Sequence, residues 1–216
     1  MDYTTLFFDL DDTLYPGDSG LWQAIIQRMG QYMLERLGFS QDQVPVLRRH
    51  YFETYGTTLK GLQIHHQVDA NEYLDYVHDL KLDDFIQPDP QLRQLLLSLP
   101  QKRYIFTNAD AGHAQRVCSF LGLEGCFQGI IDIRATGFIC KPEANAFYRA
   151  LALAGEADPQ QCVFLDDSMP NLKAARQLGF FTVLVGRQNG SEPIADVWLE
   201  TLLDMPSRMP YLWEGG

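Results

Sequence analysis

The chain has 216 residues, of which 46% are hydrophobic and 21% are charged, proportions typical of a globular protein with a sizeable core. Its 28 acidic and 17 basic residues give a formal net charge of −11, which argues against nucleic acid or an anionic membrane as the main partner. An anionic substrate would also be repelled, so a site for one must contain a metal ion, a buried cation or helix N-termini.

The start of the chain and the cysteines indicate a cytoplasmic protein. The opening MDYTTLFFDLDD has no basic stretch and turns acidic after a short apolar run, so we expect no signal peptide. No apolar run approaches the roughly 20 residues that a membrane-spanning helix needs. Without C-x-x-C pairs or zinc-finger spacing, four reduced thiols are expected, at Cys118, Cys126, Cys140 and Cys162.

The first predicted element is a buried strand at 3–10, which is rich in Phe and Leu and ends at acidic residues. A turn follows at 15–20. The next part, to residue 87, contains no strand-like run, and its apolar residues recur at helical spacing from Leu21 to Leu37. Further helices are expected near 41–55, 58–67 and 70–79. We interpret this part as a helical module inserted after the first strand.

Beyond the prolines at 88 and 90, strands and helices alternate, which predicts a parallel sheet with helices on both faces. The expected helices lie near 90–98, 111–121, 143–153 and 170–178, and the strands at 103–107, 129–133, 162–166 and 180–185, with a short one near 195–199. We therefore predict a Rossmann-like α/β core at 1–15 and 88–205, a helical cap at 16–87 and a loose tail at 206–216.

The segment that ends the first strand carries the strongest chemical signal. Side chains alternate along a strand, so Asp9 and Asp11 face one side while Leu10 faces the other. Both acids follow the carboxyl end of a buried parallel strand, where ligands bind in open α/β sheets. Paired carboxylates favour a bound cation, and oxygen ligands suit Mg²⁺. The alternative is that these acids cap the next helix.

Three later segments bring polar side chains to the same predicted edge. Thr107 and Asn108 end a strand before a helix, a corner that suits phosphate. Lys141 precedes a proline-initiated helix, and Asp166 and Asp167 end another strand and repeat the metal-site pattern. Each segment alone also fits helix capping or an exposed lysine. The ordered set is what indicates a site.

This ordered set resembles the haloacid dehalogenase superfamily, which is mostly phosphatases. Residues 9–13 look like its first motif, Thr107 its second, Lys141 its third, and Asp166 with Asp167 its fourth. The resemblance covers most of the chain and includes a helical cap after the first motif, as in the subfamily with a C1 cap. Within the superfamily, the segments that look like the pyrimidine 5′-nucleotidase branch are FFDLDDTLY, YGTTLKGL, FTNA and FLDDS.

The resemblance implies a role for each motif residue. Asp9 would attack phosphorus and form an aspartyl-phosphate. Asp11 would protonate the leaving group and then deprotonate the attacking water. Thr107 and Asn108 would hold the phosphoryl oxygens, and Lys141 would offset their negative charge.

The same resemblance implies Mg²⁺ as the cofactor. Its ligands would be Asp9, the backbone carbonyl of Asp11, and Asp167 with Asp166. Asp167 is favoured as the direct ligand, because it takes the place of the Asp in the commoner Gly-Asp form of the fourth motif. Asn171 stands where many relatives carry an acid, so this position departs from the pattern.

Other polar residues have weaker functional signals. His113 follows the Thr107 corner and would either contact a ligand or cap its helix, whereas Asp12 points away from Asp9 and is expected to be structural. The pair His65-His66 is expected on the exposed surface of the cap. From the resemblance, the cap residues expected near the substrate are Tyr55, Thr58 and Lys60.

Other reactions fit parts of this pattern. A haloacid dehalogenase would not need Asp11, and a phosphonatase would need a buried cap lysine, which neither Lys60 nor Lys81 resembles. A phosphomutase uses the same residues, and a non-catalytic phosphate-binding module, such as a receiver domain, is shorter and lacks the insert. We predict a Mg²⁺-dependent phosphomonoester hydrolase acting on a pyrimidine nucleoside 5′-monophosphate or, alternatively, on a small sugar or other metabolite phosphate.

Overall fold

The structure is a computed structural model that describes residues 3–187 and 195–214. The chain forms two compact units, and each is described by itself. The first, the α/β unit, comprises Met1–Ser19 and Ile86–Gly216, and the second, the helical unit, comprises Gly20–Phe85. The sequence predicts the insert at 16–87.

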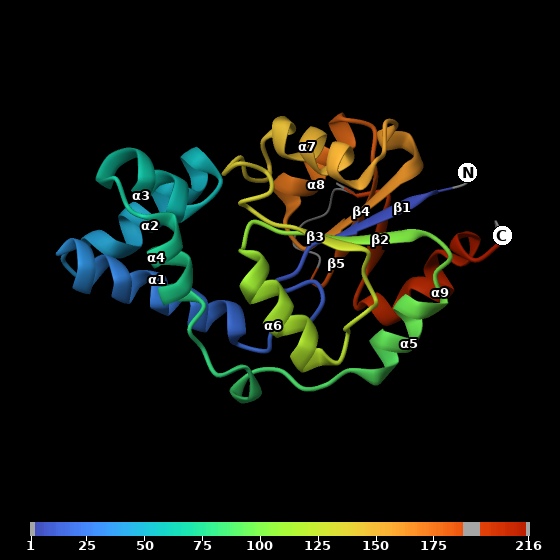
Figure 1. Ribbon diagram of the computed structural model, residues 1–216, viewed down its shortest axis with the longest axis horizontal. Coiled ribbons are helices and arrows are strands. Elements are labelled where there is room, and N and C mark those ends of the chain that lie inside the picture. The colour runs from blue at the N-terminus through green and yellow to red at the C-terminus, as the bar shows by residue number, and fades with distance from the viewer. Residues whose placement is uncertain (1–2, 188–194, 215–216) are drawn as a thin grey trace. The chain divides into compact units, whose positions relative to one another are not determined.

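The α/β unit is built on a parallel sheet, which has six strands in the order β3-β2-β1-β4-β5-β6 among the described residues (Figure 1). Strand β1 lies in the middle, because it pairs with β2 on one side and β4 on the other. The strands are Thr5–Phe8 (β1), Lys102–Phe106 (β2), Gly129–Ile131 (β3), Cys162–Asp166 (β4), Phe181–Val185 (β5) and Val197–Leu199 (β6). The predicted α/β fold class is confirmed.

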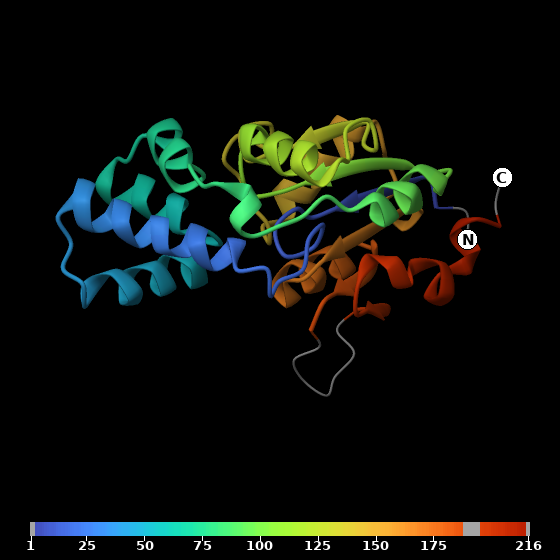
Figure 2. The ribbon, with the colours of Figure 1, turned by 90° about the horizontal axis from the view of Figure 1, so that it is seen from below.

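Helices cover both faces of this sheet, with α7 and α8 on one face and α5, α6 and α9 on the other (Figures 1 and 2). Their bounds are Pro90–Ser98 (α5), Ala111–Leu121 (α6), Ala144–Ala154 (α7), Met169–Gln177 (α8) and Met205–Arg208 (α9). Side chains alternate along β1, so Phe7 joins an aromatic core with Phe106 while the ring of Phe8 contacts Phe127. Burial on both faces explains why the strands read as continuous apolar runs.

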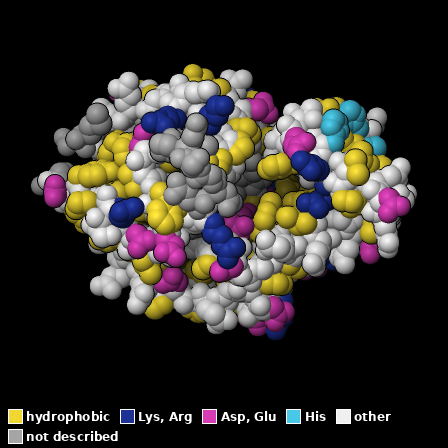
Figure 3. Space-filling model, turned by 180° about the vertical axis from the view of Figure 1, so that it is seen from behind, with side chains coloured by type: hydrophobic (Ala, Val, Ile, Leu, Met, Phe, Trp, Pro, Cys, Tyr) yellow, Lys and Arg dark blue, Asp and Glu magenta, His cyan; other side chains and the backbone are white. Residues whose placement is uncertain are grey.

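The helical unit consists of α1 (Leu21–Leu37), α2 (Gln43–Tyr55), α3 (Thr58–His66) and α4 (Ala70–Val77), followed by a 3-10 turn, Leu82–Asp84. Gly38 follows the last residue of α1, and its φ of 70° gives the left-handed turn that commonly ends a helix. Helices α2 and α3 approach closely at Gly61, where an added Cβ would overlap Tyr51. Histidines gather on one part of the surface of this unit, where His50, His65 and His66 are exposed (Figure 3).

The carboxyl-terminal segment differs from the sequence prediction. We expect a loose tail at 206–216, yet the described part of it forms the rest of α9 and a 3-10 turn, Pro210–Leu212. Met209 and Leu212 are buried, and Gln101 donates a hydrogen bond to the Leu212 carbonyl at 2.7 Å. Apolar side chains spaced three apart were the signal for this packing. Residues 215 and 216 lie outside the described residues.

The remaining general features concern membranes and thiols. Among the described residues, no helix combines the length and the apolar character needed to cross a membrane. All four cysteines are buried free thiols. Burial raises the pKa of Cys118 and of Cys162 to about 12, so both stay protonated and unreactive near neutral pH.

Candidate active site

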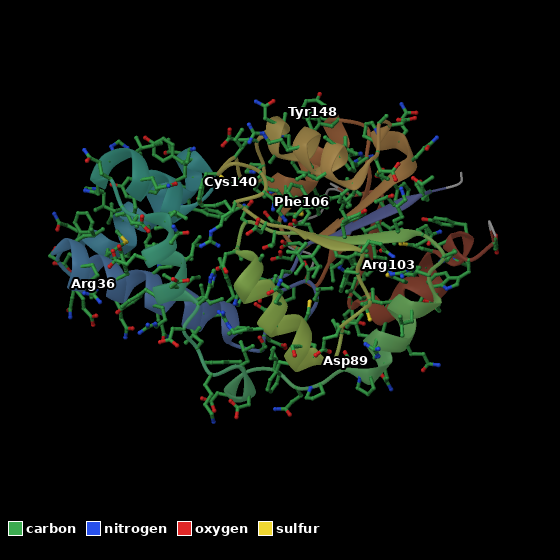
Figure 4. The ribbon with its side chains drawn as sticks, viewed as in Figure 1. Arg36, Asp89, Arg103, Phe106, Cys140 and Tyr148 are labelled. Atoms are coloured by element: carbon green, nitrogen blue, oxygen red, sulfur yellow. The ribbon has the colours of Figure 1, made fainter. Side chains whose placement is uncertain are left out.

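The candidate site lies where the central strands end. The register sets Phe8 of β1 level with Ile105 of β2 and Leu165 of β4. The next residues along the chain, Asp9 directly after β1 and Asp166 at the end of β4, therefore lie at the same edge of the sheet. Phe106 and Cys140, which precede Thr107 and Lys141 in the chain, also lie on this side of the unit (Figure 4).

Lys141 brings these segments together. Its side chain is 1% exposed, and its Nζ donates to Asp9 Oδ1 at 2.7 Å, to Asp166 Oδ2 at 2.8 Å and to the Phe106 carbonyl at 2.8 Å. An ammonium group has three protons, and each has an acceptor here. Burial lowers the pKa of Lys141, but the charges of Asp166 and Asp9 together raise it by a larger amount, so the net shift is upward. The group remains a cation.

Asn108 holds the backbone of this lysine. Its Oδ1 accepts a hydrogen bond from the Lys141 backbone nitrogen at 2.8 Å, and its Nδ2 donates to the Lys141 carbonyl at 3.0 Å. The side-chain amide is therefore engaged at both ends. Thr107 is buried beside it, and its hydroxyl accepts from the Ala109 backbone nitrogen at 2.9 Å. These contacts shape the corner that the sequence predicts for phosphate.

Both carboxylate oxygens of Asp166 accept hydrogen bonds from the protein. Its Oδ1 accepts from the Ser168 backbone nitrogen at 2.8 Å, and its Oδ2 accepts from Lys141 at 2.8 Å. The Asn171 amide lies 3.1 Å from each oxygen. Asn171, whose role the sequence leaves open, is thus a partner of this carboxylate. A neutral donor here suits a carboxylate that is fully buried.

The chemistry of the donor set fits a divalent cation. One oxygen from each of Asp9, Asp166 and Asp167 lies within 4.8 Å of the others. Burial, together with the charges of Asp166 and Asp167, raises the pKa of Asp9 well above its usual range, although Lys141 opposes this shift. Burial and the charge of Asp166 also raise the pKa of Asp167 to about 7. One lysine therefore does not balance these carboxylates, and a hard cation with oxygen ligands would.

Asp11 is held from two other parts of the α/β unit. Its Oδ1 lies 2.7 Å from the Tyr15 hydroxyl and 2.9 Å from His113 Nε2. Tyr15 is only 3% exposed, and burial with the charge of Asp11 raises its pKa well above the usual range, so the hydroxyl acts as a donor. His113 sits in the first turn of α6, where Asp110 Oδ1 accepts from its backbone nitrogen at 3.0 Å. The sequence leaves two options for His113, a ligand contact or a helix cap, and in the structure its side chain contacts the carboxylate of Asp11.

Asp12 lies in a tight turn directly after Asp11. Its φ of 58° is in the left-handed region, which is uncommon for a residue with a side chain. Burial and the charge of Asp167 raise its pKa to about 7. Its Oδ1 is buried with no hydrogen-bond partner among the described residues. The sequence, which assigns Asp12 a structural role, does not anticipate that the charge of Asp167 acts on it.

The cap residues that the sequence singles out lie in the helical unit. Within it, Thr57 caps α3 by accepting from the Lys60 backbone nitrogen at 3.1 Å. The Tyr55 hydroxyl lies 2.8 Å from His65 Nε2. Thr58 is buried, and the pair His65-His66 is exposed, as expected from the sequence.

The fold and this edge define the class of protein: an α/β protein with a buried lysine and clustered carboxylates at the carboxyl ends of parallel strands. Residues 3–179 match the family described as haloacid dehalogenase-like hydrolases. The chain belongs to that family, as the resemblance of its motifs predicts.

Two curated relatives carry phosphate chemistry in their names. The chain is 31% identical over 192 residues to Phosphate metabolism protein 8 of Saccharomyces cerevisiae, covering 82% of this chain and 60% of that protein. It is 30% identical over 99 residues to Enolase-phosphatase E1 of Schizosaccharomyces pombe, covering 46% of this chain and 38% of that protein. The chain therefore spans less than two thirds of the length of either relative.

Solved structures share the architecture. The L-2-haloacid dehalogenase from Xanthobacter autotrophicus, with chloropropionic acid covalently bound, superposes with a TM-score of 0.62 at 17% identity, over 95% of this chain and 97% of that one. At this identity the similarity shows the fold alone.

Proposed function

We propose that the protein is a Mg²⁺-dependent phosphomonoester hydrolase in which Asp9 is the nucleophile. The observation that carries this proposal is the contact between Asp9 and the buried ammonium of Lys141, beside Asp166 and Asp167. The Lys141 ammonium favours the ionised form of Asp9, against the effect of burial, and offsets the charge of an incoming phosphate. The phosphate chemistry in the names of two relatives supports the same reaction class.

The first chemical step is transfer of the phosphoryl group to the protein. A carboxylate oxygen of Asp9 attacks phosphorus, and the bond between phosphorus and the ester oxygen breaks. The electron pair of that bond stays on the leaving oxygen, which takes a proton from Asp11. The corner at Thr107 and the ammonium of Lys141 would hold the negatively charged phosphoryl oxygens during transfer.

The second step returns Asp9 to its starting state. The Asp11 carboxylate takes a proton from water, and the resulting oxygen attacks phosphorus of the aspartyl-phosphate. The bond between phosphorus and Asp9 breaks, which releases inorganic phosphate and restores both carboxyl groups. Asp11 thus serves as acid and then as base.

Asp9, Asp167 and the backbone carbonyl of Asp11 would hold Mg²⁺, which supplies positive charge opposite the phosphate when bound. Asp166 would support Lys141 rather than bind the ion directly, because Ser168, Asn171 and Lys141 already donate to its oxygens. We further propose a pyrimidine nucleoside 5′-monophosphate as the substrate. That part rests on the branch-like segments of the sequence, and a sugar or other metabolite phosphate is the second candidate.

The direct test is Asp9→Asn, which keeps the side-chain shape but removes the nucleophilic charge. We expect phosphate release from p-nitrophenyl phosphate to fall by at least about 10³-fold, and the matched variant Asp75→Asn, at an exposed carboxylate of α4, to keep its activity. Activity should also vanish in EDTA and return with Mg²⁺. Equal rates for Asp9→Asn and the unaltered protein would end the nucleophile assignment.

The substrate proposal has its own test. A panel of phosphorylated metabolites, assayed by release of free phosphate, ranks pyrimidine nucleotides against sugar phosphates and separates hydrolysis from phosphoryl transfer within a substrate. If UMP and CMP rank no higher than sugar phosphates, the nucleotidase proposal should be dropped. The hydrolase proposal would stand.

A further inference from the structure

We propose that Tyr15 and His113 are positioning residues that together fix the carboxyl group of Asp11 for proton transfer to the leaving oxygen. This inference rests on the proposed function, in which Asp11 is the acid and base. Neither Tyr15 nor His113 would touch the substrate in this role.

The geometry behind the inference is convergence on a single atom. The Tyr15 hydroxyl and His113 Nε2 both contact Oδ1 of Asp11, at 2.7 and 2.9 Å. A single hydrogen bond leaves a carboxyl group able to rotate about its Cβ–Cγ bond, whereas two contacts from different directions hold its plane.

The two partners come from elements that are themselves well fixed. Tyr15 follows a turn in which the Leu14 backbone nitrogen donates to the Leu10 carbonyl at 2.9 Å, and its side chain is buried. His113 is 1% exposed, and its place on α6 is fixed by the Asp110 cap. A buried partner that cannot swing away is what a positioning role requires.

The chemistry predicts a dependence on the leaving group. An alkoxide is a poor leaving group and needs a proton from Asp11 as the ester bond breaks, whereas p-nitrophenolate leaves without one. Loosening Asp11 should therefore slow the first step for an alkyl phosphate and spare it for p-nitrophenyl phosphate. A merely structural role would lower both rates alike.

The experiment measures single-turnover cleavage by rapid quench, so that the second step does not interfere. The substrates are p-nitrophenyl phosphate and the best alkyl phosphate from the panel. For Tyr15→Phe we expect the alkyl phosphate rate to fall about 10-fold or more, with release of p-nitrophenolate changed by less than about twofold. Tyr148→Phe, which removes the hydroxyl of an exposed tyrosine on α7, should keep both rates (Figure 4).

A matched pair at the second position separates the hydrogen bond from packing. Both His113→Gln and His113→Leu keep a side chain of similar size, but only Gln retains a donor at the distance of Nε2. We expect Leu to show the same selective loss as Tyr15→Phe and Gln to recover most of the alkyl phosphate rate. Thermal unfolding of each variant identifies any that fails to fold, in which case the Tyr15→Phe data decide alone.

The outcomes distinguish this inference from the function beneath it. Asp11→Ala should show a larger selective loss than either partner variant. If it does, but Tyr15→Phe and His113→Leu slow both substrates equally or neither, the positioning inference is wrong and the proposed function stands. If Asp11→Ala shows no dependence on the leaving group, the acid role of Asp11 fails, and the inference fails with it.

Discussion

Each end of the parallel sheet pairs a lysine with a carboxylate, but in very different surroundings. At the carboxyl end, Lys141 is 1% exposed and lies between Asp9 and Asp166. At the amino end, Lys102 Nζ lies 3.0 Å from Glu156, and the lysine side chain is 52% exposed. A lysine and a carboxylate therefore meet in a buried site at one end and in a partly exposed site at the other. Burial, not pairing, distinguishes a site that can do chemistry from an ordinary surface ion pair.

The two ends also differ in how their charges are balanced. Glu156 accepts hydrogen bonds from the Lys102 ammonium and from the hydroxyl of Thr5, the latter at 2.6 Å, so one cation and one neutral donor serve a single carboxylate. At the other end, Asp167 adds a further carboxylate close to Asp9. The amino end is satisfied by the protein alone, whereas the carboxyl end has excess negative charge that a bound cation would relieve.

The largest effect expected from this comparison is that of Lys141→Met in metal-free buffer. Removing the ammonium leaves two buried carboxylates without their cation, which should lower the free energy of unfolding by about 3–5 kcal/mol. Urea denaturation measures it. Lys173→Met, at an exposed lysine of α8, is the control and should stay within about 0.5 kcal/mol of the unaltered protein. A Lys141→Met protein of undiminished stability would show that the buried carboxylates at the carboxyl end do not depend on this cation.

An intermediate effect is expected from Asn108→Ala, which removes both hydrogen bonds to the Lys141 backbone. Leaving those two polar groups unpaired should cost about 1–3 kcal/mol of unfolding free energy. Because the lysine is no longer held in place, kcat should fall more than KM rises. Steady-state kinetics and urea denaturation check the two parts. Full activity in a destabilised protein would mean that Asn108 supports the fold and not the site.

The sequence predicts the fold class and the membership of the site at the carboxyl end, for a physical reason. Strand ends in a parallel sheet share one edge, so Asp9, Thr107 and Asp166 could be placed together from their order alone. The strand bounds differ from the prediction: β1 spans Thr5–Phe8, whereas the apolar run predicts a strand at 3–10.

The sequence did not predict which side chains contact one another within the site. Asn171 donates to Asp166, and Tyr15 and His113 converge on Asp11, but such contacts depend on side-chain geometry across the sheet edge. The spacing of Tyr15, four residues after Asp11 and next to a Pro-Gly turn, was a sequence signal for the first of these contacts with Asp11. The pairing of Asp11 with His113, 102 positions away in the chain, had no such signal.

The smallest effect on the free energy of unfolding is expected from removing the charge of Glu156 at the amino end of the sheet, and it should depend on pH. Burial raises the pKa of Glu156, but hydrogen bonds from Thr5 and Lys102 lower it more, so the net shift is below its ordinary value of 4.5. The ionised form therefore stabilises the fold at pH values above about 4.5, and this contribution is lost as the pH falls through the lower, folded-state pKa.

Glu156→Gln should accordingly lower the free energy of unfolding by about 1 kcal/mol near neutral pH, a modest value because Lys102 is half exposed. The difference from the unaltered protein should shrink in acid, where Glu156 itself becomes neutral. Urea denaturation across the pH range measures this, with Glu200→Gln, at an exposed glutamate, as the control. A loss at neutral pH as large as that of Lys141→Met would break the contrast between the two ends, because it would mean that a half-exposed lysine stabilises a carboxylate as strongly as a buried one.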